Sequence, residues 1–184
     1  MVDSHRRVGH SGPMSTAERL LDLLRASGRP FEVLDHEPAR SAEEAAERRG
    51  TALSVGAKSV VMRVDKLGFV VLVVGSDRRI EGRALRQALG VQRYRFATPE
   101  ELFALAGLIS GEVPAFGTPL FEATLVVGED FEARQELVFA AGSMIRSVRM
   151  GMADWRVVAC PRVVAPFTVA AAGLTPLAWG TGTE

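Results

Sequence analysis

The chain has 184 residues, and its 22 basic side chains balance 22 acidic ones, so the formal net charge at pH 7 is zero. With 47% hydrophobic residues, it has the composition of a globular domain with a substantial core. The balanced charge argues against a broad electropositive face that grips DNA through many phosphates, and it is compatible with a small local basic site. A single cysteine, Cys160, excludes an internal disulfide and is typical of a reducing cytoplasm.

Metal, cofactor and membrane binding are not expected either. Of the three histidines only His36 lies outside a polar leader, so the sequence offers no cluster of imidazole or thiolate ligands for zinc, and we predict no cofactor. No apolar run is long enough to cross a bilayer, so no membrane partner is expected. We interpret residues 1–14 as a disordered leader or a remnant of expression, and residues 15–184 as one domain.

Helices are indicated where a capping residue precedes an apolar stripe and a glycine follows it. Ser15 with Glu18, and Thr98 with Glu101, form capping boxes. Short runs rich in apolar residues indicate strands. The helices predicted in this way are 15–27, 41–49, 80–89, 98–106 and 152–158, and the strands are 31–36, 57–64, 69–75, 91–96, 120–128, 136–142 and 144–151. This mixture predicts an α+β fold in a single domain.

Residues 57–75 contain two apolar runs separated by a short polar turn, which predicts a β-hairpin. Side chains alternate between the two faces of a strand, so Lys58 shares a face with Val60, Met62 and Val64. This face is the apolar one, and the alternation therefore places Lys58 at the edge of the core. The other lysine, Lys66, lies in the turn and is expected in solvent.

Lys58 is the first candidate for a functional residue, because the chain has twenty arginines and only two lysines. A compact ammonium kept in an apolar setting suits a site that holds a phosphate or an oxyanion. The alternative is a lysine whose stem covers apolar surface while its head reaches solvent. Position alone slightly favours this second interpretation.

The loop from Gly107 to Pro119 is the second candidate. Gly111 and Gly117 let a ligand approach the main chain, while Pro114 and Pro119 stiffen the segment. Such a loop can direct backbone N–H groups at a carbonyl oxygen that becomes negative during acyl transfer. A plain connection between two elements is the commoner alternative.

Other polar residues carry weaker signals. His36 could act as an acid or a base, but a lone histidine after a strand is more often a packed or surface residue. Cys160 lies among valines and is interpreted as a small hydrophobe rather than a thiol nucleophile. Ser143 lacks the pattern of a nucleophile elbow. Three arginines around residues 79–90 could meet phosphates, although a solvated helix face is the simpler explanation; they are Arg79, Arg83 and Arg86.

Four stretches follow one another along the chain: FEVLDHEPARSAEEAA, AKSVVMRV, YRFATPEELFALAGLISGEVPAFG and FAAGSMIRSVRMGMADW. Together, from about Phe31 to Trp155, they resemble the YbaK-like aminoacyl-tRNA deacylases, a family that includes the editing insertion of bacterial prolyl-tRNA synthetases and its free-standing relatives. The resemblance implies a compact α+β domain in which a mixed sheet curls into a partial barrel with helices around it. It also implies an enzyme that acts on tRNA carrying the wrong amino acid.

Carried over position by position, the resemblance implies roles for individual residues. Lys58 matches a strand lysine that holds the phosphate or ribose region of the terminal adenosine, and His36 matches the histidine of an H-x-P-like segment. Gly142 and Ser143 match a turn that lines the pocket, and Asp154 matches an acidic position that closes the last helix. A glycine–proline loop that surrounds the aminoacyl group is matched by Gly111, Glu112, Val113, Pro114, Ala115, Phe116 and Gly117.

Two residues of this loop depart from the family pattern. Relatives usually carry paired glycines or a proline where this chain has Glu112 and Ala115. A loop without that proline gives a pocket of different shape, which affects the choice of substrate first.

The resemblance thus predicts a trans-editing hydrolase that deacylates mischarged tRNA, with a proline tRNA carrying a wrong small amino acid as the expected substrate. The ester to be cut is already reactive, so positioning and oxyanion stabilisation can suffice without a metal or a protein nucleophile. Lys58 would anchor the 3′ end, and backbone amides near Gly111 would polarise the carbonyl. The expected partners are the 3′ end of aminoacyl-tRNA and a prolyl-tRNA synthetase. A non-catalytic module that binds aminoacyl-tRNA or another nucleotide ligand is the alternative, and turnover separates the two.

Overall fold

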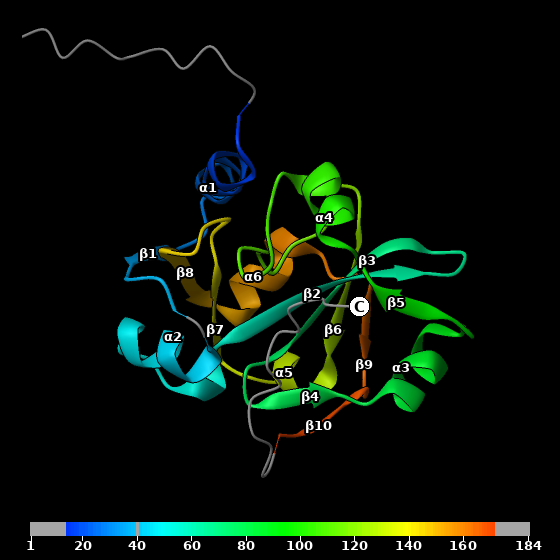
Figure 1. Ribbon diagram of the computed structural model, residues 1–184. Coiled ribbons are helices and arrows are strands. Elements are labelled where there is room, and N and C mark those ends of the chain that lie inside the picture. Colours follow the sequence, from blue (N-terminus) through cyan, green and yellow to red (C-terminus); the bar gives the residue numbers. More distant parts are fainter. Residues whose placement is uncertain (1–13, 40, 172–184) are drawn as a thin grey trace, which may run out of the picture.

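The computed structural model describes residues 14–39 and 41–171. The predicted leader lies outside these residues except for Met14, and so does the end of the chain from residue 172. The elements follow one another as drawn in Figure 1: α1 (Thr16–Ser27), β1 (Phe31–Asp35), α2 (Ala42–Arg49), the 3₁₀ helix η1 (Leu53–Val55), β2 (Ala57–Val64), β3 (Gly68–Gly75), β4 (Arg78–Ile80), α3 (Gly82–Leu89), β5 (Tyr94–Phe96), α4 (Pro99–Ala106), β6 (Thr124–Gly128), α5 (Glu129–Glu132), β7 (Glu136–Ala140), β8 (Arg146–Gly151), α6 (Met152–Ala159), β9 (Val163–Ala165) and β10 (Thr168–Ala170).

The helices begin and end where local signals place them. Ser15 caps α1 and Thr98 caps α4, each in a complete capping box with a glutamate three residues later. Glycines in the left-handed conformation end the first four helices, which releases the chain without a Cβ clash; they are Gly28, Gly50, Gly90 and Gly107. The five helices predicted from the sequence are confirmed within one or two residues.

The strands of the described residues form three sheets. The largest has the order β5-β2-β3-β6-β9 and combines antiparallel pairs around β2 with parallel pairs around β6. The others are β1-β8-β7 and the short pair β10-β4. The predicted α+β class with a mixed sheet is confirmed, and none of the three sheets closes into a barrel within the described residues.

Each face of the five-stranded sheet has its own hydrophobic core. On the first face, Val61, Val71 and Val73 pack with side chains from α1, α4 and α6. On the second face, Met62 and Leu72 are among the residues that pack with side chains from α3 and with Phe167. Figure 1 shows α4 above the sheet and β4 with β10 below it. We use the names first face and second face in this sense below.

Several short elements escaped prediction. The strands β4, β9 and β10 have three residues each, and α5 has four. Such segments are too short to show a period, and β10 forms only through its pairing with β4, almost ninety residues earlier. Strand β9, in the apolar segment after Trp155, is an edge strand of the five-stranded sheet.

The interpretation of Cys160 as a packed hydrophobe is wrong, because its side chain is exposed. Cys160 follows the buried Ala159 and ends α6 with a left-handed backbone, φ +46°. This conformation turns the chain out of the helix, and the thiol donates a weak hydrogen bond to the Val157 carbonyl at 3.1 Å instead of entering the core.

Candidate active site

One row of residues crosses the strands on the second face. Gly56 and Val138 form a parallel bridge that joins the start of β2 to β7. This register, carried two residues further, brings Lys58 level with Ala140, which pairs with Ser147 of β8. Val148 and Met150 of β8 pack in the first core, so Ser147 points the other way. Lys58 and Ser147 therefore both lie on the side opposite the first core. We count this side of β7 and β8 with the second face, and we call the arrangement the Lys58–Ser147 row.

Lys58 lies half-buried in this row. The sequence prediction that it shares a face with Met62 and Val64 is confirmed, because both pack in the second core. Its Nζ donates a hydrogen bond to the Arg78 carbonyl oxygen of β4 at 3.0 Å. A neutral carbonyl does not cancel the positive charge, so the ammonium can still attract an anion.

Burial is the main influence on the Lys58 ammonium. It lowers the pKa of Lys58 below the ordinary value of 10.5, because desolvation disfavours the charged form. The negative charges of Glu43 and Asp77 act in the opposite direction. Lys58 is thus a cation held in a partly dry setting, unlike Lys66, which is exposed in the hairpin turn.

Ser147 connects two further side chains of this face. Its Oγ lies 2.9 Å from Nε2 of His36 and 3.2 Å from Nη1 of Arg49, which comes from the end of α2. The other ring nitrogen of His36, Nδ1, lies 3.0 Å from the Glu37 carbonyl oxygen. A carbonyl can only accept, so Nδ1 carries the proton, and in the neutral ring Nε2 accepts from the Ser147 hydroxyl while Arg49 donates to it. Ser147 is 2% exposed, so its hydroxyl is held in place by the surrounding protein. Its hydrogen bonds therefore fix the positions of the His36 and Arg49 side chains.

Arg49 adds a second cation to the site. Burial lowers its pKa, although an arginine stays charged at neutral pH. The Arg49 Nε atom is buried without a hydrogen-bond partner. A buried donor of this kind is costly when unpaired, so the Arg49 guanidinium is suited to receive an acceptor from a ligand.

The tip of the glycine loop, Gly111 and Glu112, contacts the turn that connects β7 to β8. The Gly142 N–H donates to the Glu112 carbonyl oxygen at 3.1 Å, two residues beyond Ala140. Gly111 has φ +96°, a backbone conformation that favours glycine, and a Cβ added there would lie 2.8 Å from Sδ of Met144. The structure thus brings Gly111 beside the turn of Gly142 and Ser143.

His36 joins this end through the backbone, since its N–H donates to the Ile145 carbonyl oxygen at 2.9 Å. The Ser143 Oγ stays within the turn and accepts from the Ile145 N–H at 3.3 Å. Four of the residues singled out from the sequence therefore meet at one end of the β7–β8 hairpin; they are His36, Gly111, Gly142 and Ser143. Lys58 lies on β2, whose start is bridged to β7.

The remainder of the glycine loop lies elsewhere. The segment from Val113 to Gly117, which includes Pro114, is buried. Val113, Ala115 and Phe116 pack in the first core, on the opposite face from Lys58. The Ala115 carbonyl oxygen accepts from Nε1 of Trp155 at 2.9 Å, and the Phe116 ring lies 5.6 Å from that of Phe139. The structure gives these residues packing contacts, and a direct role in binding substrate stays a prediction for them.

Asp154 also lies apart from the row. It belongs to α6, which packs on the first face, and its Oδ1 is 3.2 Å from Nη1 of Arg29 in the link between α1 and β1. This ion pair fastens the start of β1 to α6. The structure does not bring Asp154 together with Lys58.

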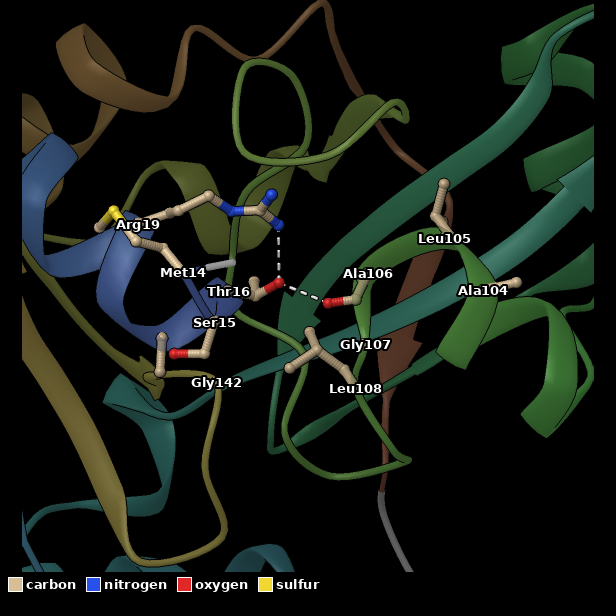
Figure 2. Close-up of a pocket in the computed structure, with 11 residues that line it drawn as sticks. Met14, Ser15, Thr16, Arg19, Ala104, Leu105, Ala106, Gly107, Leu108 and Gly142 are labelled. Atoms are coloured by element: carbon tan, nitrogen blue, oxygen red, sulfur yellow. Dashed lines mark hydrogen bonds between the residues drawn. The ribbon is translucent and has the colours of Figure 1, made fainter. Parts of the chain in front are cut away.

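A pocket of about 320 Å³ opens on the first face between the start of α1 and the end of α4. Figure 2 shows that the Thr16 hydroxyl donates to the Ala106 carbonyl, while Arg19 donates to the Thr16 oxygen at 2.9 Å. Gly142 is the one lining residue with a predicted role in the site. A Cβ at Gly142, where φ is +76°, would lie 2.9 Å from the Ala17 Cα atom, so glycine allows α1 to approach the turn.

Sequence reasoning missed Arg49 and Ser147. A signal for Arg49 existed, because it lies three residues after the buried Ala46 and hence on the inner side of α2. Ser147 could be placed on the face opposite Val148, but nothing local shows that α2 covers that face. Its partners lie 98 and 111 residues away in the sequence.

The described residues hold no group of three or more His, Cys, Asp or Glu side chains placed to bind a metal ion. None of the helices described is both long and apolar enough to span a bilayer. Two cations, a hydrogen-bonded histidine and an exposed glycine backbone can together hold an anionic group and polarise a carbonyl.

Comparison with known proteins agrees with this chemistry. Residues 36–157 match the family described as the aminoacyl-tRNA editing domain. The matched region contains Lys58, Ser147 and the whole glycine loop. The chain belongs to this family of aminoacyl-tRNA deacylases.

Curated relatives and solved structures show the same likeness. The chain is 34% identical over 155 residues to the multifunctional Ser/Thr-tRNA deacylase ProXp-y of Escherichia coli K12, which covers 81% of this chain and 91% of the relative. The same protein from Escherichia coli O157:H7 matches equally. Among solved structures, one described as a proposed trans-editing enzyme for prolyl tRNA synthetase superposes with a TM-score of 0.73 at 24% identity, covering 86% of this chain and all of that one. The hypothetical protein APE2540 superposes with the same TM-score at 21% identity, covering 83% of this chain, and at such identities the likeness concerns the fold.

Proposed function

We propose that the chain removes serine or threonine from mischarged tRNA, with the reaction taking place at the Lys58–Ser147 row. The observation that carries the location is the half-buried Lys58 ammonium. It lies two residues after the bridge that joins β2 to β7, and β7 leads into the turn that contacts the tip of the glycine loop. The named relatives of 34% identity, which act on Ser/Thr-tRNA, support the choice of amino acids. Both amino acids are small, as the sequence comparison with editing enzymes predicted.

In this proposal the charged residues hold the substrate and the backbone assists the chemistry. Lys58 binds the phosphate or ribose region of the terminal adenosine, and the Arg49 guanidinium donates a hydrogen bond to another oxygen of the substrate. The exposed backbone at Gly111 faces the ester carbonyl, whose oxygen becomes negative as water attacks the carbonyl carbon. The bond between the carbonyl carbon and the ribose oxygen then breaks, the ribose oxygen takes a proton, and the free amino acid leaves.

A hydroxyl-bearing amino acid fits the polar character of the row. A site that offers hydrogen bonds to a substrate hydroxyl rejects an analogue without it, because its own buried groups would then stay unpaired. Ser147, His36 and Arg49 supply such groups on the second face. We therefore expect serine and threonine esters to be cut faster than alanine esters.

The test compares the two lysines of the chain. Seryl-, threonyl- and alanyl-tRNA are incubated with the wild type, Lys58→Ala and the matched control Lys66→Ala, which removes the exposed lysine of the hairpin turn. We expect Lys58→Ala to lower kcat/KM by about a hundredfold or more, as for other charge-stabilising groups, and Lys66→Ala to leave it within about twofold.

The outcomes separate the possible functions. Equal hydrolysis by Lys58→Ala and wild type would remove Lys58 from the site. Binding of aminoacyl-tRNA without any hydrolysis would show a recognition module instead of an enzyme. Proline tRNA as the specific carrier, a prolyl-tRNA synthetase as partner and the cytoplasm as the place of action stay predictions, and a panel of tRNAs with added synthetase tests the first two.

A further inference from the structure

Positive charge is concentrated in one short segment of this neutral chain. Residues 78–96 contain six arginines and a single acidic residue, Glu81, which gives this segment a formal charge of +5. The whole chain has a net charge of zero, so the other residues sum to −5. The balance of the composition therefore conceals a strong local excess.

The segment folds into β4, α3 and β5 on the second face. Helix α3 packs through the buried Leu85 against the second core, which leaves its polar side in solvent. Two of the six guanidinium groups are neutralised, since Arg78 pairs with Asp130 at 2.6 Å and Arg95 pairs with Glu101 at 2.6 Å. The other four side chains are exposed, and within the described residues no carboxylate lies within 4.0 Å of their guanidinium nitrogens; they are Arg79, Arg83, Arg86 and Arg93.

Aromatic rings accompany these arginines. Phe96 at the end of β5 is 66% exposed, an unusual position for a large apolar ring. Its strand partner is Met62, so Phe96 lies on the face that Lys58 occupies. The Arg86 guanidinium carbon lies 5.8 Å from the centre of the Tyr94 ring. Exposed rings and guanidinium planes are the groups on which unpaired bases stack, while the charges bind phosphates.

This surface continues directly from the candidate active site. The Lys58 ammonium is bonded to the carbonyl of Arg78, and Arg79 is the next residue along β4 before α3 begins. Along β2, Lys58 and Met62 are four residues apart, a distance of about 13 Å. Stacked nucleotides advance by about 3.4 Å each, so Phe96 would meet a nucleotide roughly four positions from the acylated end.

From this placement we propose that Arg79, Arg83, Arg86, Arg93 and Phe96 bind the acceptor arm of the tRNA whose 3′ end lies at Lys58. The proposal rests on the function proposed above and extends it from the reacting end to the rest of the RNA. The arginines hold successive phosphates of the strand, and the Phe96 ring stacks on a base near the point where the unpaired 3′ end meets the acceptor helix. A chain of zero net charge thus gains affinity for RNA through one basic surface.

The test measures binding of uncharged tRNA by fluorescence anisotropy over a series of salt concentrations. The variants are Arg83→Gln/Arg93→Gln, which removes two charges from the surface, and Phe96→Ser. The matched control is Arg25→Gln/Arg162→Gln, which removes two exposed arginines from α1 and from the segment before β9. We expect the first variant to bind about tenfold more weakly, with the slope of log K against log salt reduced by about 1.4 to 1.8. The control is expected to stay within twofold.

Deacylation distinguishes this surface from the active site. On full-length seryl-tRNA, Arg83→Gln/Arg93→Gln is expected to raise KM with little change in kcat, while on serine esterified to adenosine it matches the wild type. Equal tRNA binding by wild type, variant and control would overturn the proposal, and so would a loss of activity on the short ester. If the wild type hydrolyses neither substrate but binds tRNA through these arginines, the proposed reaction fails and this proposal stands.

Discussion

The two faces of the five-stranded sheet differ sharply in what they bury. The first face covers an apolar core that takes in most of the glycine loop, with Phe116 and Trp155 fully buried. The second face has an apolar centre too, but a half-buried ammonium, a buried serine and a partly buried guanidinium lie at one end of it. These charged and polar groups thus lie together on the second face, while the first face buries mainly apolar side chains.

This difference teaches how a motif can serve two purposes. The glycine loop is one continuous segment, yet only its tip at Gly111 and Glu112 reaches the turn beside the Lys58–Ser147 row. The segment that follows, from Val113 to Gly117, anchors the tip in the first core. Four changes test this division, and they are ordered by the size of the expected effect.

Gly117→Ala is expected to lower the stability of the protein most, because it disturbs the packing of the first core. A Cβ at Gly117 would overlap the carbonyl oxygen of Ala123, and this backbone cannot move without disturbing the core. We expect a loss of about 3 kcal/mol or more in the free energy of unfolding. Gly107→Ala is the control, because it has a left-handed backbone but no atom within 4 Å, and about 1–2 kcal/mol is expected there. Equal losses in urea denaturation would contradict the packing role of the loop.

Ser147→Ala acts on the second face. It leaves His36 Nε2 and Arg49 Nη1 without the oxygen that connects them, and unpaired buried groups cost about 1–3 kcal/mol. Deacylation is expected to fall about tenfold at the same time, because both side chains lose their fixed position. Ser27→Ala removes a hydroxyl with local partners only, since it donates to the Leu24 carbonyl oxygen and accepts from the Arg29 N–H, and it should leave the rate of deacylation unchanged. A normal rate with normal stability would exclude Ser147 from the site.

The pH dependence of deacylation sharpens the assignment of Lys58. Burial lowers the pKa of Lys58, so the ammonium is lost at a lower pH than in an exposed lysine. Once spontaneous ester hydrolysis is subtracted, kcat/KM should fall as the pH rises through a value below 10.5. In Lys58→Arg, any remaining activity should persist to higher pH, since an arginine does not lose its proton there. An alkaline limb that is the same in both proteins would belong to another group.

Glu101→Gln is the mildest change and concerns α4 on the first face. The hydrogen bonds from Arg95 and from the Thr98 backbone lower the pKa of Glu101 from 4.5 to about 2. The unfolded chain therefore takes up this proton at higher pH than the folded one, so Glu101 stabilises the fold fully above pH 4.5, and this contribution is lost as the pH falls towards 2. Thermal unfolding between pH 2 and 5 should depend less steeply on pH in the variant. An unchanged slope would show that this ion pair does not stabilise the fold.

Sequence patterns predicted the elements well where their causes are local. The capping boxes at Ser15 and Thr98 and the alternation around Lys58 depend on residues within a few positions, and each is confirmed. Failures come from contacts between distant parts of the chain. Strand β10 exists through its pairing with β4, and Ser147 gains its partners from α2 and from the end of β1.

The candidate site follows the same rule. Lys58 attracted notice through composition and its neighbours in the sequence, since it is one of two lysines among 22 basic residues and lies in an apolar run. Arg49 shows no such signal among twenty arginines, and its importance depends on the fold that lays α2 over Ser147. Glycine and proline content singled out the glycine loop, and the likeness to editing enzymes implied a role in binding for all of it. The alternation rule does not extend to a loop, so the burial of Val113 to Gly117 needed the structure.

The exposed Cys160 has a practical consequence for all of these measurements. It is the chain's single thiol and lies at the end of α6, which packs on the first face, away from Lys58. A maleimide dye will therefore attach at one known position in the unaltered protein, with one dye per molecule. RNA labelled at its 5′ end can then report docking by energy transfer, and no engineered reporter needs to be introduced near the charged face.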